Sequence, residues 1–280
     1  MMSTHWSSSL KSLFDRDDAE IPLFEVSLIF ASHLYQNLNT TEVTVELDRL
    51  RIELKERVFG TKLFLDRLSA LNEFLFVSNG FKPNREDYFD PRNSCMNEVL
   101  SRRTGIPISL SILYIELGRF IDLNLSGVCF PGHFLVRCDE DDQLIFIDVF
   151  SKGQFLSWSD LQEALRKNRG GEVSPAIVSS LVAPSTNRAI LTRFLQNLRA
   201  IYMERGDHEK SLVILNWIIE FGLVCAEDHL NRAKVCEGLG ATGASIIDYE
   251  RSLLMEPGQP NAEQVKLKIS NLRKIVQQVN

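Results

Sequence analysis

The sequence has few cysteines, and their spacing does not suggest a disulfide framework or a metal site. Five occur among 280 residues, namely Cys95, Cys129, Cys138, Cys225 and Cys236. The number is odd and no two of them form a C-x-x-C pair, so neither paired disulfides nor a zinc site is indicated. We therefore expect free thiols in a reducing compartment, with no metal and no cofactor.

The sequence also lacks an excess of positive charge and a long apolar run. It has 31 Lys and Arg against 37 Asp and Glu, a net charge of −6, which argues against non-specific binding to nucleic acid or anionic lipid. Uncharged stretches such as 26–41 are shorter than the ~20 residues that span a bilayer. No basic start followed by an apolar segment marks a secretion signal. We expect a cytoplasmic protein that binds neither nucleic acids nor membranes.

What the N-terminal part does have is apolar residues at helical spacing. Leucine, valine, isoleucine and phenylalanine recur every three or four residues over 21–35, 41–58 and 62–76, a period that predicts three amphipathic helices. The polar and aromatic segment 84–93 reads as a loop. Pro107 precedes a long apolar run, and proline is favoured in a first helical turn, so a buried helix is predicted to start there.

The central part changes to a strand-like pattern. Short β-prone runs over 125–130, 133–138 and 143–150 predict antiparallel strands, with an acidic turn at 139–142 between the last two. Ser159 lies three residues before Gln162, a capping-box arrangement that predicts the start of another helix.

The C-terminal part is predicted to consist of helical repeats. Residues 168–184 contain glycines and prolines without a clear period, so we expect a connection there, with a domain boundary after residue 183. Beyond it, one offset of 34 residues aligns Gly206 with Gly240, Ser211 with Ser245, Leu215 with Tyr249 and Ile219 with Leu253. That offset is typical of tetratricopeptide repeats. Two copies are few for a free solenoid, so the repeats are expected to pack on neighbouring helices or to bind a protein or peptide.

One pair of side chains could carry out chemistry. If the turn at 139–142 closes a four-residue hairpin, Cys138 pairs with Gln143 and His133 lies directly opposite Asp148. Opposite side chains on one face have Cβ atoms ~4.5–5.5 Å apart, close enough for the imidazole and the carboxylate to meet. A carboxylate that fixes the tautomer of a histidine orients it as a general base. The alternative is an ordinary structural pair of polar groups.

A nucleophile for this pair would be favoured at a helix N-terminus, where unpaired N–H groups stabilise negative charge. Ser109 has that position, and Cys95 and Cys129 are the sulfur alternatives. A serine in a first helical turn can equally be a cap. In the preceding loop, four residues with polar groups could either line the same cleft or hold the loop together by hydrogen bonds. They are Tyr88, Asp90, Arg92 and Asn93.

Four stretches carry a resemblance to a known family. They are Asn93-Ser94, Arg102 to Ser111, Phe130 to Leu135, and Phe146 to Phe150. Together they resemble bacterial SirB-type transglutaminase-like proteins with C-terminal tetratricopeptide repeats. The wider transglutaminase and papain-like fold has a catalytic triad of a helix-start Cys, a strand His and a following Asp. His133 and Asp148 match the last two positions, whereas residues 107–109 contain no cysteine.

The resemblance implies an α+β fold in which a helical N-terminal part surrounds a small antiparallel sheet, over 1–183, followed by helical repeats over 184–280. The family's link to invasion-gene regulation in enteric bacteria implies a virulence-associated regulator. We thus expect a regulatory or protein-interaction protein on a degenerate transglutaminase-like core. The alternative is an active hydrolase or acyltransferase on peptide-like amides, with His133, Asp148 and a Ser or Cys nucleophile.

Overall fold

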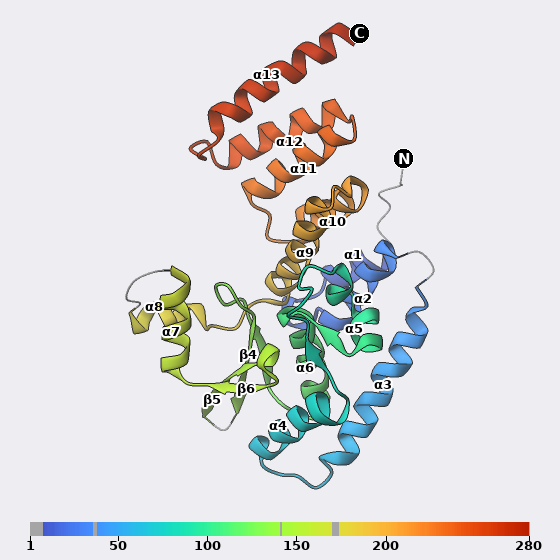
Figure 1. The fold of residues 1–280 in the computed structure, drawn as a ribbon, viewed down its shortest axis with the longest axis vertical. Helices are drawn as coiled ribbons and strands as arrows, with labels where there is room; N and C mark the ends of the chain where they lie inside the picture. Colours follow the sequence, from blue (N-terminus) through green and yellow to red (C-terminus); the bar gives the residue numbers. More distant parts are fainter. Residues whose placement is uncertain (1–7, 36–37, 141, 170–173, 280) are drawn as a thin grey trace. The chain divides into compact units, whose positions relative to one another are not determined.

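The structure is a computed structural model that describes residues 8–35, 38–140, 142–169 and 174–279. By its contacts the chain divides into two compact units, Met1–Leu191 and Thr192–Asn280. The boundary predicted after residue 183 stays a prediction. The described part is mostly helical with small sheets (Figure 1). None of its helices is both long and apolar enough to cross a membrane.

The first unit begins with helices. They are α1 (Ser8–Phe14), α2 (Leu23–Leu34), α3 (Thr40–Arg57), α4 (Phe64–Asn72), α5 (Met96–Arg102) and α6 (Pro107–Phe120). Of these, α2, α3 and α4 correspond to the three that the apolar spacing predicted, whereas α1 and α5 were not predicted. The predicted helix over 62–76 is α4 continued by a π-helical turn, η2 (Glu73–Ser78). Such a turn was not foreseen, because a π-turn has no period of its own to recognise in a sequence. The loop before α5 contains the 3₁₀ turn η3 (Pro91–Ser94).

Helix α6 is the central element of this unit and starts at Pro107, as predicted. Apolar side chains from Ile108 to Leu117 are buried around almost its whole circumference, which is the pattern of a helix enclosed by protein on all sides. One face of α6 packs on strands β3 (Leu125–Val128) and β4 (Leu135–Glu140). Gly118 faces Leu125 so closely that an added Cβ would lie 2.2 Å from a Leu125 methyl group.

A four-stranded antiparallel sheet in the order β3-β4-β5-β6 follows, where β5 is Gln143–Asp148 and β6 is Gln154–Leu156. The strand expected over 133–138 starts two residues later and reaches Glu140. Its partner for Gln143 is Glu140 rather than Cys138, so the predicted four-residue turn is wrong. Two residues connect the strands, and Asp142 adopts φ 59°, a left-handed conformation that asparagine and aspartate tolerate in tight turns.

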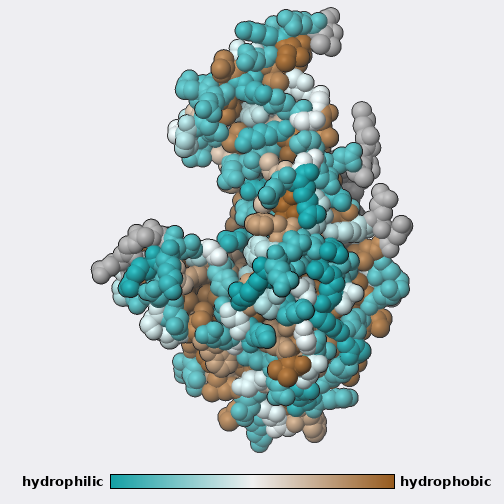
Figure 2. Space-filling view, in the orientation of Figure 1, coloured by the Kyte–Doolittle hydropathy of each residue, from teal (hydrophilic) through white to brown (hydrophobic). Residues whose placement is uncertain are grey.

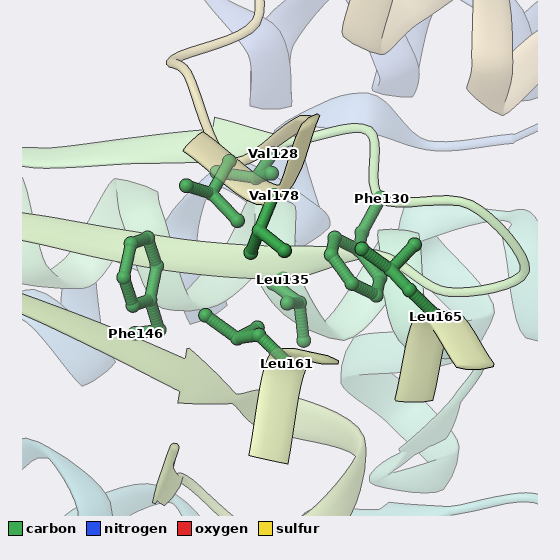
Figure 3. Close-up of a cluster of buried hydrophobic side chains, with 8 residues drawn as sticks. Val128, Phe130, Leu135, Phe146, Leu161, Leu165 and Val178 are labelled. Carbon is green, nitrogen blue, oxygen red and sulfur yellow. The ribbon is translucent and has the colours of Figure 1, made fainter. Parts of the chain in front are cut away.

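The face of the sheet opposite α6 is covered by α7 (Trp158–Arg169) and α8 (Pro175–Leu181). Figure 3 shows the buried cluster between the sheet and these two helices, to which strands and helices both contribute. Its members are Val128, Phe130, Leu135, Phe146, Leu161, Leu165, Val178 and Val182. The sheet is therefore a middle layer, and side chains that alternate along β4 and β5 enter two different cores.

Two predictions for this region need correction. The helix expected from Ser159 and Gln162 is capped two residues earlier: Ser157 Oγ accepts from the N–H of Asp160, whose carboxylate accepts from the N–H of Ser157. The predicted connection over 168–184 contains the helix α8. Residues 170–173 of this connection lie outside the described part. In α8 only Val178 is fully buried, too little for a periodic pattern to appear in the sequence.

The second unit is built from helices that follow one another along the chain (Figure 1). They are α9 (Asn187–Glu204, which starts in the first unit), α10 (His208–Phe221), α11 (Ala226–Gly238), α12 (Thr242–Met255) and α13 (Ala262–Val279). Gly206 and Gly240 both adopt positive φ, 69° and 74°, in the turns before α10 and α12. Ser211 and Ser245, one helical turn further on, are both fully buried. The 34-residue offset thus recurs in the turns and in the burial.

Candidate functional site

His133 and Asp148 meet at one end of the sheet. His133 Nε2 lies 2.9 Å from Asp148 Oδ1, although the two are not opposite one another as predicted. The register pairs Val136 with Ile147, so the next residue of β4, Leu135, lies opposite Asp148. His133 therefore reaches the carboxylate diagonally. A register shift of two residues keeps every side chain on the same face, which explains why the contact formed despite the wrong pairing.

Local turns hold both residues in place. Asp148 ends β5 and caps the 3₁₀ turn η4 (Val149–Ser151), accepting from the N–H of Ser151 at 3.1 Å. His133 follows the turn Phe130-Pro131-Gly132, in which its N–H donates to the Phe130 carbonyl. Gly132 has φ 73° and an added Cβ would lie 2.0 Å from Asn168 Nδ2. This amide donates to the Pro131 carbonyl at 2.7 Å and so ties α7 to the turn that carries the histidine.

The electrostatics fix the proton arrangement of the pair. Burial acts to raise the pKa of Asp148, but hydrogen bonds from His133 and Ser151, with the attraction of the imidazole, outweigh it and hold that pKa below its usual range. The ionised carboxylate can only accept hydrogen bonds, so Nε2 must carry a hydrogen. In the neutral imidazole the other nitrogen, Nδ1, is then an acceptor, the state that a general base or a hydrogen-bond receptor needs.

An apolar cavity of about 310 Å³ adjoins His133. Its walls come from the 130–135 segment, from β6 and from α7, and consist of Phe130, Pro131, Gly132, His133, Leu135, Leu156, Leu161, Ala164, Lys167 and Asn168. Figure 2 shows hydrophobic surface along the strands, beside the lobe formed by α7 and α8. The side chains of His133 and Asp148 are 28% and 14% exposed. The pair is therefore accessible from an apolar recess rather than sealed in the core.

Ser109 is placed at the start of α6, as predicted, but its hydroxyl has structural partners. Oγ donates to the Asn93 carbonyl at 2.6 Å and accepts from the N–H of Ile106 at 3.1 Å. The residue is fully buried. Its position three residues into the helix makes it the N3 member of a capping arrangement. The structure brings His133 and Asp148 together, and it joins Ser109 to the preceding loop.

The sulfur alternatives occupy different environments. Cys95 is buried and precedes α5, and the Cys129 N–H donates to Ser185 Oγ at 2.9 Å, with its Sγ 4.0 Å from the Ala189 carbonyl. On β4, burial raises the pKa of Cys138 to about 11, so that thiol stays protonated at neutral pH. No thiolate is indicated beside His133 by these contacts.

The loop 84–93 is clasped by buried polar groups, the second of the two interpretations given above. Asn93 Nδ2 donates to the Asp87 and Tyr88 carbonyls, and Asn93 Oδ1 accepts from Asn84 and Arg102. Ser109 is linked to this clasp through the Asn93 carbonyl. Ser109, predicted as a nucleophile from its place in the first turn of a helix, thus helps to hold a loop.

Arg92 and Arg102 pair with the buried carboxylate of Asp90. Burial acts to raise the pKa of Asp90, but the hydrogen bonds and charge of the arginines keep it below its usual range. This ion cluster fixes the end of the same loop before α5.

Another hydrogen-bond chain supports the pair and was missed in the sequence. The fully buried Tyr114 donates its hydroxyl to Asn72 Oδ1 at 2.8 Å, and Asn72 Nδ2 donates to the Gly153 carbonyl at 3.0 Å. The Gly153 N–H in turn donates to the Asp148 carbonyl at 2.9 Å. The Lys152-Gly153 turn is a recognisable signal in the sequence, but its partner Asn72, 81 residues away, carries none.

Comparison with known proteins identifies the class to which this site belongs. Residues 41–196, which include Ser109, His133 and Asp148, match the family described as transglutaminase-like superfamily. No solved structure matches the chain. The match covers more than half of the chain, and the helix, strand and pair geometry described above lies within it.

Similar proteins narrow the family. A UPF0162 protein of Xylella fastidiosa (strain 9a5c) is 33% identical over 260 residues, 91% of both chains. One of Pseudomonas aeruginosa is 30% identical over 237 residues, 83% of this chain and 84% of its own. Human F-box only protein 21 is 31% identical over 165 residues, 56% of this chain and 24% of its own. The chain belongs to the transglutaminase-like superfamily and to the UPF0162 family.

Proposed function

We propose that this protein is a cytoplasmic regulatory protein that acts by binding another polypeptide. Its transglutaminase-like core is degenerate as an enzyme, and the cavity beside His133 receives an apolar side chain of the partner. The observation that carries this proposal is the hydroxyl of Ser109. It lies within residues 107–109, where the resemblance places the nucleophile of the fold, yet it is buried and hydrogen-bonded to backbone groups of Ile106 and Asn93.

The geometry around the cavity supports binding. With Nε2 hydrogen-bonded to Asp148, the neutral imidazole of His133 has Nδ1 as its acceptor, which could receive an N–H of a bound backbone. Around it the walls are mainly leucine, phenylalanine and alanine, and ligand sites typically combine apolar walls with a few polar groups. Human F-box only protein 21 has a similar segment over 24% of its length, as expected of a module used in different chains.

We further propose that α9 to α13 form tetratricopeptide-like repeats. This is supported by the 34-residue offset between the Gly206 and Gly240 turns and between the buried serines that follow. Helix pairs stacked in this way present grooves to partner segments. The repeats would provide a second contact surface for the same partner or pack against neighbouring helices.

The cavity can be tested by filling it. Ala164 lines the cavity on α7, and Ala164→Trp should occupy it without removing any hydrogen bond. Peptides selected from a random library on the full-length protein should lose at least about tenfold in affinity for Ala164→Trp, measured by fluorescence anisotropy. Arg166→Trp, on an exposed part of the same helix, should leave the affinity unchanged. Equal affinities for wild type and Ala164→Trp would refute the proposed site.

A second candidate function, acyl transfer or hydrolysis, is favoured by one observation, the oriented His133–Asp148 pair at 2.9 Å. Such a pair could activate a nucleophile on a peptide-like amide. Fluorophosphonate and iodoacetamide probes test it, since the candidate requires labelling that disappears in His133→Ala. Labelling that is absent, or that persists in this variant, supports the binding function instead.

A further inference from the structure

The cavity beside His133 becomes polar toward one end of helix α7. Leu161, Ala164 and Lys167 all line it, and residues three apart lie on one face of a helix. Leu161 is fully buried, Ala164 is exposed, and the Lys167 side chain is 76% exposed. The cavity wall therefore runs from an apolar inner end at Leu161 to a cation at the rim.

The turn that carries the histidine meets the same rim. Asn168, the neighbour of Lys167, donates from Nδ2 to the Pro131 carbonyl at 2.7 Å, and Pro131 lies two residues before His133. An amide nitrogen has two hydrogens, and in the part of the chain that the structure describes only this carbonyl accepts from Asn168. His133, Lys167 and Asn168 are the polar side chains of the cavity lining, and this contact brings them to the same end of it.

The charge of Lys167 is only loosely paired. Its Nζ is 3.6 Å from Glu163 Oε1, beyond hydrogen-bond distance, whereas Arg166 binds the same carboxylate at 3.1 Å. An ammonium has three N–H donors, and none of them has an acceptor among the described residues. The residues that line the cavity include no carboxylate. An anionic group in the cavity would therefore meet a cation whose hydrogen-bond donors are available.

The cavity has room for one residue with a large side chain. Its volume of about 310 Å³ is at the lower end of the ~300–1,000 Å³ typical of ligand sites. Phe130, Leu135 and Leu161 form apolar walls, and all three belong to the buried cluster of Figure 3. A leucine, isoleucine or phenylalanine side chain would exchange water for apolar contacts there.

We propose that this cavity binds the C-terminal residue of a partner polypeptide, an inference that rests on the proposed function and names the part of the partner that is bound. A chain end with an apolar last residue carries a side chain, an N–H and a carboxylate on adjacent atoms. The side chain enters the apolar end of the cavity, and the N–H donates to His133 Nδ1. The carboxylate accepts from Lys167 and from the second N–H of Asn168. A residue inside a chain has no charge to pair with Lys167.

The occupant is the end of a chain rather than a free amino acid. The amino nitrogen of a free amino acid is an ammonium at neutral pH, and it lies two bonds from the carboxylate carbon. It would bring a second positive charge close to Lys167, and like charges repel. In a polypeptide the same nitrogen is a neutral amide, which suits the acceptor on His133.

The proposal is tested with acetyl-Gly-Ser-Gly-Leu, which ends in a free carboxylate, and with the same peptide ending in an amide. Both are titrated into the full-length protein, and the imidazole resonances of His133 are followed by NMR. The carboxylate peptide should bind at least about fivefold more tightly, because the amide cannot form the charge-assisted hydrogen bonds. The resonances of His229, which is buried in the second unit, should not shift.

Two neighbouring residues of α7 provide matched variants. Lys167→Gln should abolish the preference, so that the two peptides bind within about twofold of one another. Arg166→Gln removes the same charge outside the cavity lining and should keep the preference. Free leucine should bind the wild type at least about tenfold more weakly than the carboxylate peptide. Circular dichroism checks that each variant is folded.

The other outcomes separate this inference from the proposed function. Equal affinities of the two peptides, both weakened by Ala164→Trp, overturn recognition of the terminal carboxylate and retain the cavity as a binding site. A preference that persists in Lys167→Gln overturns the pairing of the carboxylate with Lys167. Free leucine that binds as tightly as the carboxylate peptide overturns the polypeptide as its source. If neither peptide shifts the His133 resonances, the inference fails, while library selection with Ala164→Trp still decides the proposed function.

Discussion

Among the described residues, each unit contains a histidine hydrogen-bonded to an aspartate, and the two pairs have similar distances but different burial and different partners. In the first unit His133 Nε2 is 2.9 Å from Asp148; in the second, His229 Nδ1 is 2.8 Å from Asp248. The side chains of the second pair are 8% and 3% exposed, against 28% and 14% in the first.

The partners of the two carboxylates explain the difference. Asp248 is also held by Arg232, whose Nε and Nη2 donate to its two oxygens at 2.7 and 2.8 Å, and whose Nη1 donates to Asn216 at 2.9 Å. This network ties α10, α11 and α12 together. Asp148, in contrast, is held by His133 and by Ser151, and no arginine is among its partners in the described part of the chain. A His–Asp contact therefore indicates a site only where its surroundings leave one nitrogen usable.

The largest predicted effect is a difference between the two pairs in how much each aspartate contributes to the free energy of unfolding. Asp248→Ala leaves a buried guanidinium and imidazole without their acceptor and should lower the free energy of unfolding by about 3–5 kcal/mol. Asp148→Ala, in a partly exposed pair, should cost about 1–2 kcal/mol. Urea denaturation followed by circular dichroism measures both. Glu250 lies on α12, the helix of Asp248, and Glu250→Ala, which removes an exposed ion pair with Arg273 of α13, should cost less than about 0.5 kcal/mol. Equal losses for the two aspartates would break the comparison.

A second prediction concerns support from outside the pair. Asn72→Ala leaves the buried Tyr114 hydroxyl and the Gly153 carbonyl without their partners and should cost about 1–3 kcal/mol. Because Gly153 also bonds to Asp148, the imidazole resonances of His133 should shift in NMR spectra, while those of His229 stay in place. The control is Asn79→Ala, which removes one hydrogen bond to the Phe74 carbonyl in the π-helical turn η2 that follows Asn72. It should leave the resonances of both histidines unchanged. Unshifted His133 signals would contradict the supporting role.

The first pair could be predicted from the sequence and the second could not, for a physical reason. In a hairpin, side chains alternate with a period of two, so even a register wrong by two residues places His133 and Asp148 on one face. Between helices, periodicity shows which face is buried but not which residue meets which across the interface. His229 and Asp248, on successive helices, therefore gave no signal.

The fold, too, has parts that could be predicted from the sequence and parts that could not. Helices α2, α3 and α6 and the three longer strands follow from strong local patterns. Helix α8 was missed even though Ser174 and Pro175 are ordinary signals for a helix start, because few of its residues are apolar and buried. The capping role of Ser109 was one of its two interpretations in the sequence, but its hydrogen bond to the Asn93 carbonyl, 16 residues away in a loop, could not be predicted.

A further prediction is that neither His133 nor Asp148 acts on a nucleophile. Two serines of α6, Ser109 and Ser111, test this. Ser109→Ala should lower the free energy of unfolding by about 1–2 kcal/mol, because the Asn93 carbonyl and the Ile106 N–H lose a partner. Ser111 is equally buried on the same helix, but its hydroxyl has no hydrogen-bond partner among the described residues. Ser111→Ala should therefore be neutral or slightly stabilising. An unchanged stability of Ser109→Ala, with loss of His133-dependent probe labelling, would make Ser109 a nucleophile.

The smallest predicted effect is a pH dependence that belongs to the first pair. The folded-state pKa of Asp148 is held below its usual range, so its ionised form stabilises the fold above the unfolded pKa of about 3.9. This contribution is lost as the pH falls through the folded pKa. Asp148→Asn cannot ionise, so its free energy of unfolding should fall less steeply than that of the wild type between about pH 5 and pH 3. Asp66→Asn, on the surface of α4, controls for a change of net charge. Parallel curves for wild type and Asp148→Asn in urea denaturation would show that the carboxylate gains nothing from His133 and Ser151, and would remove the electrostatic reason for assigning the acceptor role to Nδ1.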